Sequence, residues 1–166
     1  MYTIHSQTIA LLPVPNPGRE QGELHTLIFE INRSFIVPYP PTQIVKRHVR
    51  KYAGSYMAQQ ERAMKMLKET KMVPIACPTA SGFEIALTPT HAATNPKVIW
   101  FAPIHILRFD HRHQCIYTRY GTHFLFPVAE ETYNRQFVKG ITLQRMLSNR
   151  KQFLLHYKSS KKQHTS

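Results

Sequence analysis

The sequence predicts a single α+β domain in which an antiparallel or mixed sheet is packed with two to three helices. Its 166 residues are enough for one hydrophobic core, and 42% of them are apolar, which is typical of a folded globular protein. Short β-branched and apolar runs bounded by turn residues recur along the chain and are typical of strands. Three other segments repeat their apolar residues every three or four positions, which is typical of amphipathic helices.

Seven runs of the first kind predict the strands. They are Thr8–Pro13, Leu24–Val37, Val73–Cys77, Phe83–Thr88, Val98–Phe109, Gln114–Tyr120 and His123–Val128. Gly121 lies between the last two runs and favours a hairpin turn there. Prolines punctuate the chain, but none of the proline-rich segments is long enough to be an interdomain linker. We therefore expect residues 1–158 to form one domain and residues 159–166 to form a basic, flexible tail.

The segment Thr42–Tyr52 has the clearest helical pattern, with Thr42 as its expected N-cap. At about 100° per residue, one arc of this helix carries its apolar residues and a histidine: Ile44, Val45, His48, Val49 and Tyr52. The opposite arc carries four cations: Lys46, Arg47, Arg50 and Lys51. Ala53-Gly54-Ser55 then supplies a glycine stop and a serine N-cap for a second helix, Tyr56–Thr70. A third helix is expected over Asn134–Asn149, where Gly140 weakens the pattern.

The positive charge of the chain is concentrated in two blocks. The formal net charge is +13, from 22 Lys+Arg and 9 Asp+Glu. Residues 31–75 hold nine of the cations and two acids, residues 133–166 hold eight cations and no acid, and residues 76–132 are neutral. Two basic blocks on helices predict a surface that binds a polyanion, and nucleic acid fits this better than a membrane because no long helix combines an apolar face with a basic rim.

The sequence offers little for catalysis or metal binding. No paired carboxylates, nucleophile motif or phosphate-binding glycine loop is present, so we expect no enzyme activity and no cofactor. His111, His113 and Cys115 would share one face of a strand, but their segment is equally typical of the tip of a connection. Without the paired spacing of structural zinc sites, we expect no metal. Trp100 and His105 lie in an apolar run and are expected in the core.

The same features predict where the protein acts. The first residues lack the basic and apolar segments of an export signal, and the longest apolar stretch, Val98–Leu107, is too short to cross a membrane. The two cysteines are therefore expected to be reduced thiols. We expect a soluble, cytoplasmic protein associated with the nucleoid.

Five motifs from Gln43 onward form a recognisable pattern: QIVKRHVRKYAGSY (43–56), VPI (73–75), TPTHAATNP (88–96), Trp100 with His105-Ile106, and RKQFLLHY (150–157). With these motifs the sequence resembles the ComK family of bacterial competence transcription factors. The likeness spans about Phe35–Lys158, and residues 43–106 are its specific part. The chain departs from the family pattern at Val49, where relatives carry a cysteine, at Gln59-Gln60, where they carry basic residues, and at Asn95, where an arginine is expected. These departures bear on the preferred DNA box and on the strength of binding.

The resemblance implies a transcription activator that binds A/T-rich duplex DNA as a homodimer or tetramer, partly through the minor groove. It also implies that a proteolytic adaptor reads a C-terminal motif consisting of Phe153, Leu154, Leu155 and Tyr157, although ordinary helix packing explains those residues equally well. Ten basic residues are expected to contact the DNA: Lys46, Arg47, Arg50, Lys51, Arg62, Lys65, Arg33, Arg145, Arg150 and Lys151.

Three other functions stay open at this point. An RNA-binding module would expose aromatic side chains on a sheet for base stacking. A small hydrolase or metal-dependent enzyme would use the histidines. A regulatory paralogue that has lost strong DNA binding would act through protein–protein contacts.

Overall fold

The structure is a computed structural model that describes the backbone of residues 1–15 and 24–164 and the side chains as far as Arg150. The elements follow in this order: β1 (Thr8–Pro15), β2 (Leu24–Glu30), β3 (Ser34–Val37), α1 (Pro41–Ala53), α2 (Tyr56–Leu67), β4 (Ile75–Pro78), β5 (Glu84–Pro89), β6 (Trp100–Phe101), the 3₁₀ turn η1 (Pro103–His105), β7 (Ile106–Asp110), β8 (Cys115–Thr118), β9 (His123–Leu125) and α3 (Glu130–His164).

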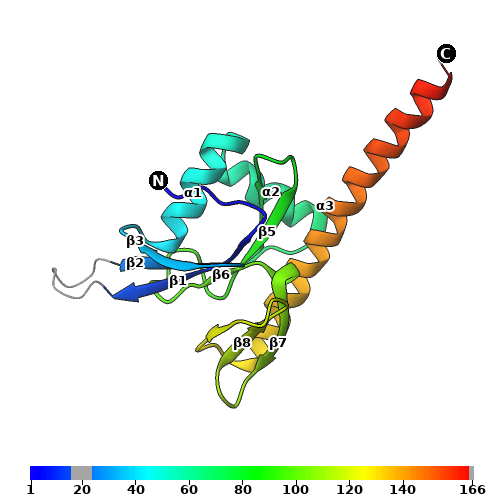
Figure 1. The fold of residues 1–166 in the computed structure, drawn as a ribbon. Coiled ribbons are helices and arrows are strands. Elements are labelled where there is room, and N and C mark those ends of the chain that lie inside the picture. Colours follow the sequence, from blue (N-terminus) through cyan, green and yellow to red (C-terminus); the bar gives the residue numbers. More distant parts are fainter. Residues whose placement is uncertain (16–23, 165–166) are drawn as a thin grey trace.

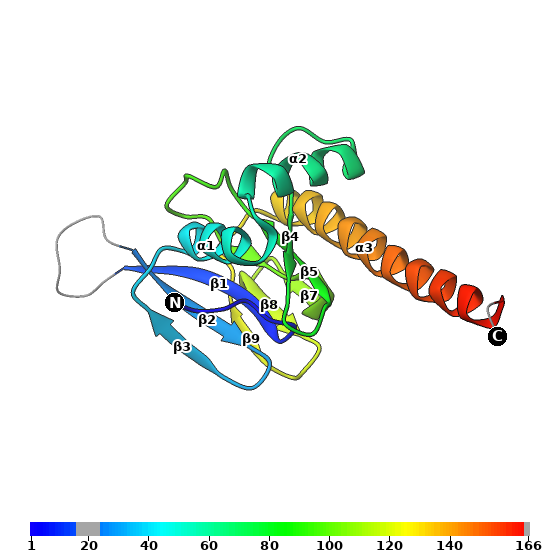
Figure 2. The same cartoon turned by 90° about the horizontal axis from the view of Figure 1, so that it is seen from above.

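Two antiparallel sheets organise the fold (Figure 1). The larger has six strands in the order β3-β2-β1-β6-β5-β4, and the smaller has three in the order β7-β8-β9. The helix α1 lies over one face of the large sheet and the small sheet lies on its other side. Seen from above, α3 runs beside β4 and β5, and its C-terminal part extends away from the body (Figure 2). The predicted α+β class, an antiparallel or mixed sheet with two to three helices, is confirmed: the described residues form two antiparallel sheets and three helices.

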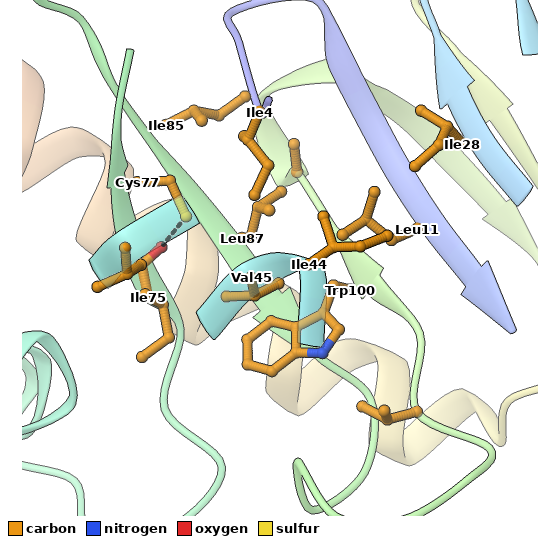
Figure 3. Packing of buried hydrophobic residues seen from close by; sticks show 13 residues of the cluster. Ile4, Leu11, Ile28, Ile44, Val45, Ile75, Cys77, Ile85, Leu87 and Trp100 are labelled. Carbon is orange, nitrogen blue, oxygen red and sulfur yellow. Dashed lines mark hydrogen bonds between the residues drawn. The ribbon is translucent and has the colours of Figure 1, made fainter. Parts of the chain in front are cut away.

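The main hydrophobic core lies between α1 and the large sheet (Figure 3). Ile44, Val45 and Val49 of α1 are fully buried there, as their spacing predicts. Trp100 of β6 is also fully buried, and its indole Nε1 donates a hydrogen bond to the Thr42 hydroxyl at 3.0 Å. The expected place of Trp100 in the core is confirmed, and α1 is fixed on the sheet at its N-terminal end.

Two further clusters cover the opposite face of the large sheet. One is rich in aromatic residues and joins β1 and β6 to the small sheet, with Phe101 and Phe126 packed edge to face at 5.4 Å. The other joins α3 to β4 and β5 through Ala76, Ala86 and Leu143. Neighbouring residues on β4 and β5 belong to the main core, so strand alternation places α1 and α3 on opposite faces of the sheet.

The structure corrects several expected boundaries. The run Leu24–Val37 is a hairpin of two strands, because the chain turns where Glu30 N–H donates to Arg33 C=O at 2.8 Å. The run Val98–Phe109 is broken at Pro103, whose ring suits the start of the 3₁₀ turn but not the middle of a strand. The chain passes there from the large sheet to the small one.

The helix ends are partly as expected. Thr42 is not an N-cap, because α1 begins at Pro41 and the Thr42 hydroxyl bonds to Trp100 and to Ala93 C=O instead. Ser55 does cap α2, accepting a hydrogen bond from Ala58 N–H at 3.3 Å, and Gly54 ends α1 with φ +85°. The helix α3 is longer at both ends than the predicted Asn134–Asn149. Residues 159–164 belong to it, and the expected flexible tail stays a prediction because side chains there are not described.

Candidate nucleic-acid interface

The outward face of α1 carries four exposed cations: Lys46, Arg47, Arg50 and Lys51. The inward face of the same helix is buried in the main core, so packing against the sheet holds the cations toward solvent. The structure thus brings together the four residues that the helical spacing predicts on one arc.

In the part of the chain with described side chains, none of these four cations forms an ion pair with a carboxylate. Three of them lie over aromatic rings instead: Arg47 over Tyr39 at 5.4 Å, Lys46 over Tyr56 at 5.2 Å, and Lys51 over Tyr52 at 5.3 Å from the ring centroid. A cation–π contact orients a cation without neutralising its charge. The face therefore keeps its full positive charge for a partner.

A cavity of about 460 Å³ opens beside this face, between α1 and the N-terminal segment. Arg47, Arg50 and Lys51 line it together with Tyr2 and Thr3. A pocket bounded by three cations has the chemistry to hold a phosphate group. Sequence reasoning did not find Tyr2 and Thr3, because no local signal links them to a helix more than 40 residues away.

His48 holds the N-terminal segment against α1. Its Nε2 donates to Pro78 C=O at 2.6 Å, since a carbonyl can only accept, and its Nδ1 accepts from Ile4 N–H at 3.2 Å. Burial lowers the pKa of His48, and so does the nearby positive charge of Lys51, while the hydrogen bond to Pro78 opposes the shift. His48 is therefore neutral and positions the wall of the cavity.

Two other arginines that are predicted to contact DNA are already paired with carboxylates. Arg62 forms an ion pair with Glu84 at 2.8 Å, and both side chains are 29% exposed. Arg33 bonds to Glu30 at 2.5 Å and lies over the ring of Phe35. These contacts bring each arginine next to a carboxylate, which reduces the charge that it offers to a polyanion. Lys65, by contrast, is exposed on α2.

The predicted residues on α3 lie apart from the α1 face. Arg145 and Arg150 are exposed, but α3 packs against the opposite face of the large sheet. Lys151 and the four residues of the expected adaptor motif, Phe153, Leu154, Leu155 and Tyr157, lie outside the residues whose side chains are described.

The histidines do not form a shared site in the described part of the chain. His111 and His113 lie in the β7–β8 connection. His111 contacts Glu130 at 3.6 Å, and His113 bonds to Asp110 at 2.8 Å. Cys115 begins β8 and is buried, so the three residues do not alternate along one strand. His105 is a buried histidine with both ring nitrogens bonded, to Tyr120 and to Ser6 C=O, as expected for the core. No group of three or more metal-ligating side chains occurs among the described residues.

The fold and this face define an α+β protein with an exposed basic helix, an arrangement suited to a polyanion. The chain belongs to the ComK family, whose pattern, described as ComK protein, matches residues 1–152. The competence transcription factor of Bacillus subtilis (strain 168) is 29% identical over 108 residues, which are 65% of this chain and 53% of that relative. The matched region therefore spans about half of the relative's length. No solved structure matches the chain, and no helix within the described residues is long and apolar enough to cross a membrane.

Proposed function

We propose that this protein is a transcription regulator, an activator, that binds A/T-rich duplex DNA through the outward face of α1. The observation that carries the proposal is the set of four α1 cations that are exposed and have no carboxylate partner among the described side chains. Family membership supports the regulatory role, because the similar protein from Bacillus subtilis is a competence transcription factor. No enzyme activity and no cofactor is part of this proposal.

The chemistry assigns different contacts to the two kinds of cation. Lys46 and Lys51 are point charges and bind backbone phosphates. Arg47 and Arg50 can also enter the minor groove, whose negative potential is greatest where A/T-rich DNA narrows it. The cavity lined by both arginines is then the place where the DNA backbone meets the N-terminal segment.

The number of contacts sets the expected salt dependence. Each neutralised phosphate of a duplex contributes about 0.9 to the slope of log affinity against log salt. Four contacts from α1 give a slope of about −3.6, which is a loss of roughly a hundredfold in affinity between about 50 and 200 mM salt. Contacts from Lys65, Arg145, Arg150 or Lys151 would steepen it further.

The test is a salt series of fluorescence-anisotropy titrations with A/T-rich and G/C-rich duplexes of equal length. Replacing both arginines (R47Q/R50Q) should weaken binding and reduce the slope by about 1.8, since two phosphate contacts are lost. The matched control, K71Q/K97Q, removes the same charge from exposed positions outside α1 and should keep the slope of the parent. Equal losses in the two variants, or unchanged binding by R47Q/R50Q, would contradict the proposal.

The wider assembly is also proposed. We expect the protein to act as a homodimer or tetramer. The C-terminal adaptor motif stays a prediction. Binding to chromosomal DNA would place the protein in the cytoplasm on the nucleoid.

A further inference from the structure

The small sheet carries a row of three aromatic or planar side chains on its outer face. Arg108 on β7, Tyr117 on β8 and His123 on β9 are directly paired across the strands. The Arg108 guanidinium lies 4.0 Å from the centre of the Tyr117 ring, and the Tyr117 and His123 rings are 5.8 Å apart and tilted by 35°. The three groups therefore form one continuous planar row.

The side chains of this row do not belong to the hydrophobic core. The neighbouring residues Phe109, Ile116 and Phe124 pair across the same strands and point the other way, into the aromatic-rich cluster beneath the large sheet. Because side chains alternate between the faces of a strand, the row must lie on the face away from that cluster. Arg108 and His123 are exposed and Tyr117 is half-buried.

The surroundings of the row are basic and apolar. Arg112 is exposed in the β7–β8 connection and Arg119 in the β8–β9 turn, so cations flank the row at both ends of β8. In the described part of the chain, Arg108, Arg112 and Arg119 have no ion-pair partner, while the Asp110 carboxylate is bonded to His113. Leu107 and Leu125 are 59% and 73% exposed beside the row.

We propose that this outer face of the small sheet binds single-stranded DNA by stacking unpaired bases on the Arg108–Tyr117–His123 row. Three adjacent strands span about 10 Å, which is room for two or three bases. Aromatic and guanidinium planes on an open sheet stack any base, and flanking cations hold the phosphates between them. That the ligand is DNA rests on the proposed function, whereas the stacking site itself does not depend on α1. The two surfaces lie on opposite sides of the large sheet.

The test measures binding of a labelled oligo(dT) of twelve nucleotides to the full chain. The duplex titration described for the α1 face is run in parallel. Replacing the ring without changing charge (Y117L) should weaken oligo(dT) binding about tenfold, as expected for the loss of one stacked base. The duplex affinity should stay within twofold of the parent. The conservative variant Y117F keeps the ring and should bind oligo(dT) like the parent.

Three results would overturn this inference. They are unchanged oligo(dT) binding by Y117L, an equal loss for the duplex, and tighter binding of oligo(rU) than of oligo(dT), which would assign the face to RNA. If Y117L does not melt cooperatively, H123L tests the same row at an exposed position and should also weaken oligo(dT) binding. The duplex results of R47Q/R50Q decide the proposed function separately, because that variant leaves the row intact.

Discussion

Replacing Gly140 by alanine should destabilise the protein, although alanine favours helices. In a helix interior, alanine gains about 1 kcal/mol over glycine. A Cβ atom at Gly140, however, would lie 2.1 Å from the Thr88 hydroxyl oxygen and 2.5 Å from a Pro103 ring carbon. Thr88 is fully buried and Pro103 is rigid and buried, so α3 itself would have to move away from β5.

The size of the effect follows from these opposing contributions. Overpacking of this kind costs about 1–3 kcal/mol, and two close contacts place Gly140 near the upper end. The net loss is then about 2 kcal/mol in the free energy of unfolding, which lowers the melting temperature by roughly 4–8 °C for a chain of this size.

Urea titration and thermal melting followed by circular dichroism measure this change. Val138→Ala is the control, since Val138 is 60% exposed on the same helix and its replacement should be neutral or slightly stabilising. Thr88→Ala should cost less in the Gly140→Ala background than alone, because it makes room for the new methyl group. A Gly140→Ala variant as stable as the parent would refute the close approach of α3 and β5.

Two further predictions concern buried polar groups. Acidification below about pH 6.5 should lower the free energy of unfolding. Burial lowers the pKa of His48 and of His105 in the folded protein. These two histidines therefore bind protons at a higher pH in the unfolded chain than in the folded protein. Urea titrations between pH 7.5 and 5.5 measure the trend, which His48→Gln should weaken. Gln144→Ala should cost about 2 kcal/mol, because Gln144 Oε1 accepts from the buried Ala86 N–H at 2.8 Å. Hydrogen exchange at that amide should then become faster, and unchanged exchange would count against the bond.

The features that the sequence predicts well are those set by local periodicity. The two faces of α1 follow from residue spacing alone, because buried residues recur every three or four positions and the cations fall between them. The Ser55 cap and the Gly54 stop follow from local backbone chemistry. The membership of Trp100 in the core follows from its apolar surroundings.

The features that were missed depend on contacts between distant residues. From the sequence, Gly140 is expected only to weaken a helix. In the structure it lies where α3 approaches β5 too closely for any side chain. The Arg108–Tyr117–His123 row is hidden because its members lie on three strands whose register no local pattern fixes. Arg62 looks like an available cation, yet Glu84, 22 positions away, forms an ion pair with it.

The N-terminal segment shows how such distant contacts shape the candidate interface. His48 binds Ile4 N–H, His105 binds Ser6 C=O at 2.7 Å, and the buried Glu30 carboxylate accepts from Tyr2 at 2.6 Å. These bonds join the segment to α1, to η1 and to β2, so its position follows the packing of all three. They use neutral histidines and a tyrosine hydroxyl, and so add no positive charge to the α1 face. In the proposed complex with DNA, the cations of α1 would therefore set how steeply binding depends on salt, while the N-terminal segment sets the shape of the cavity beside them.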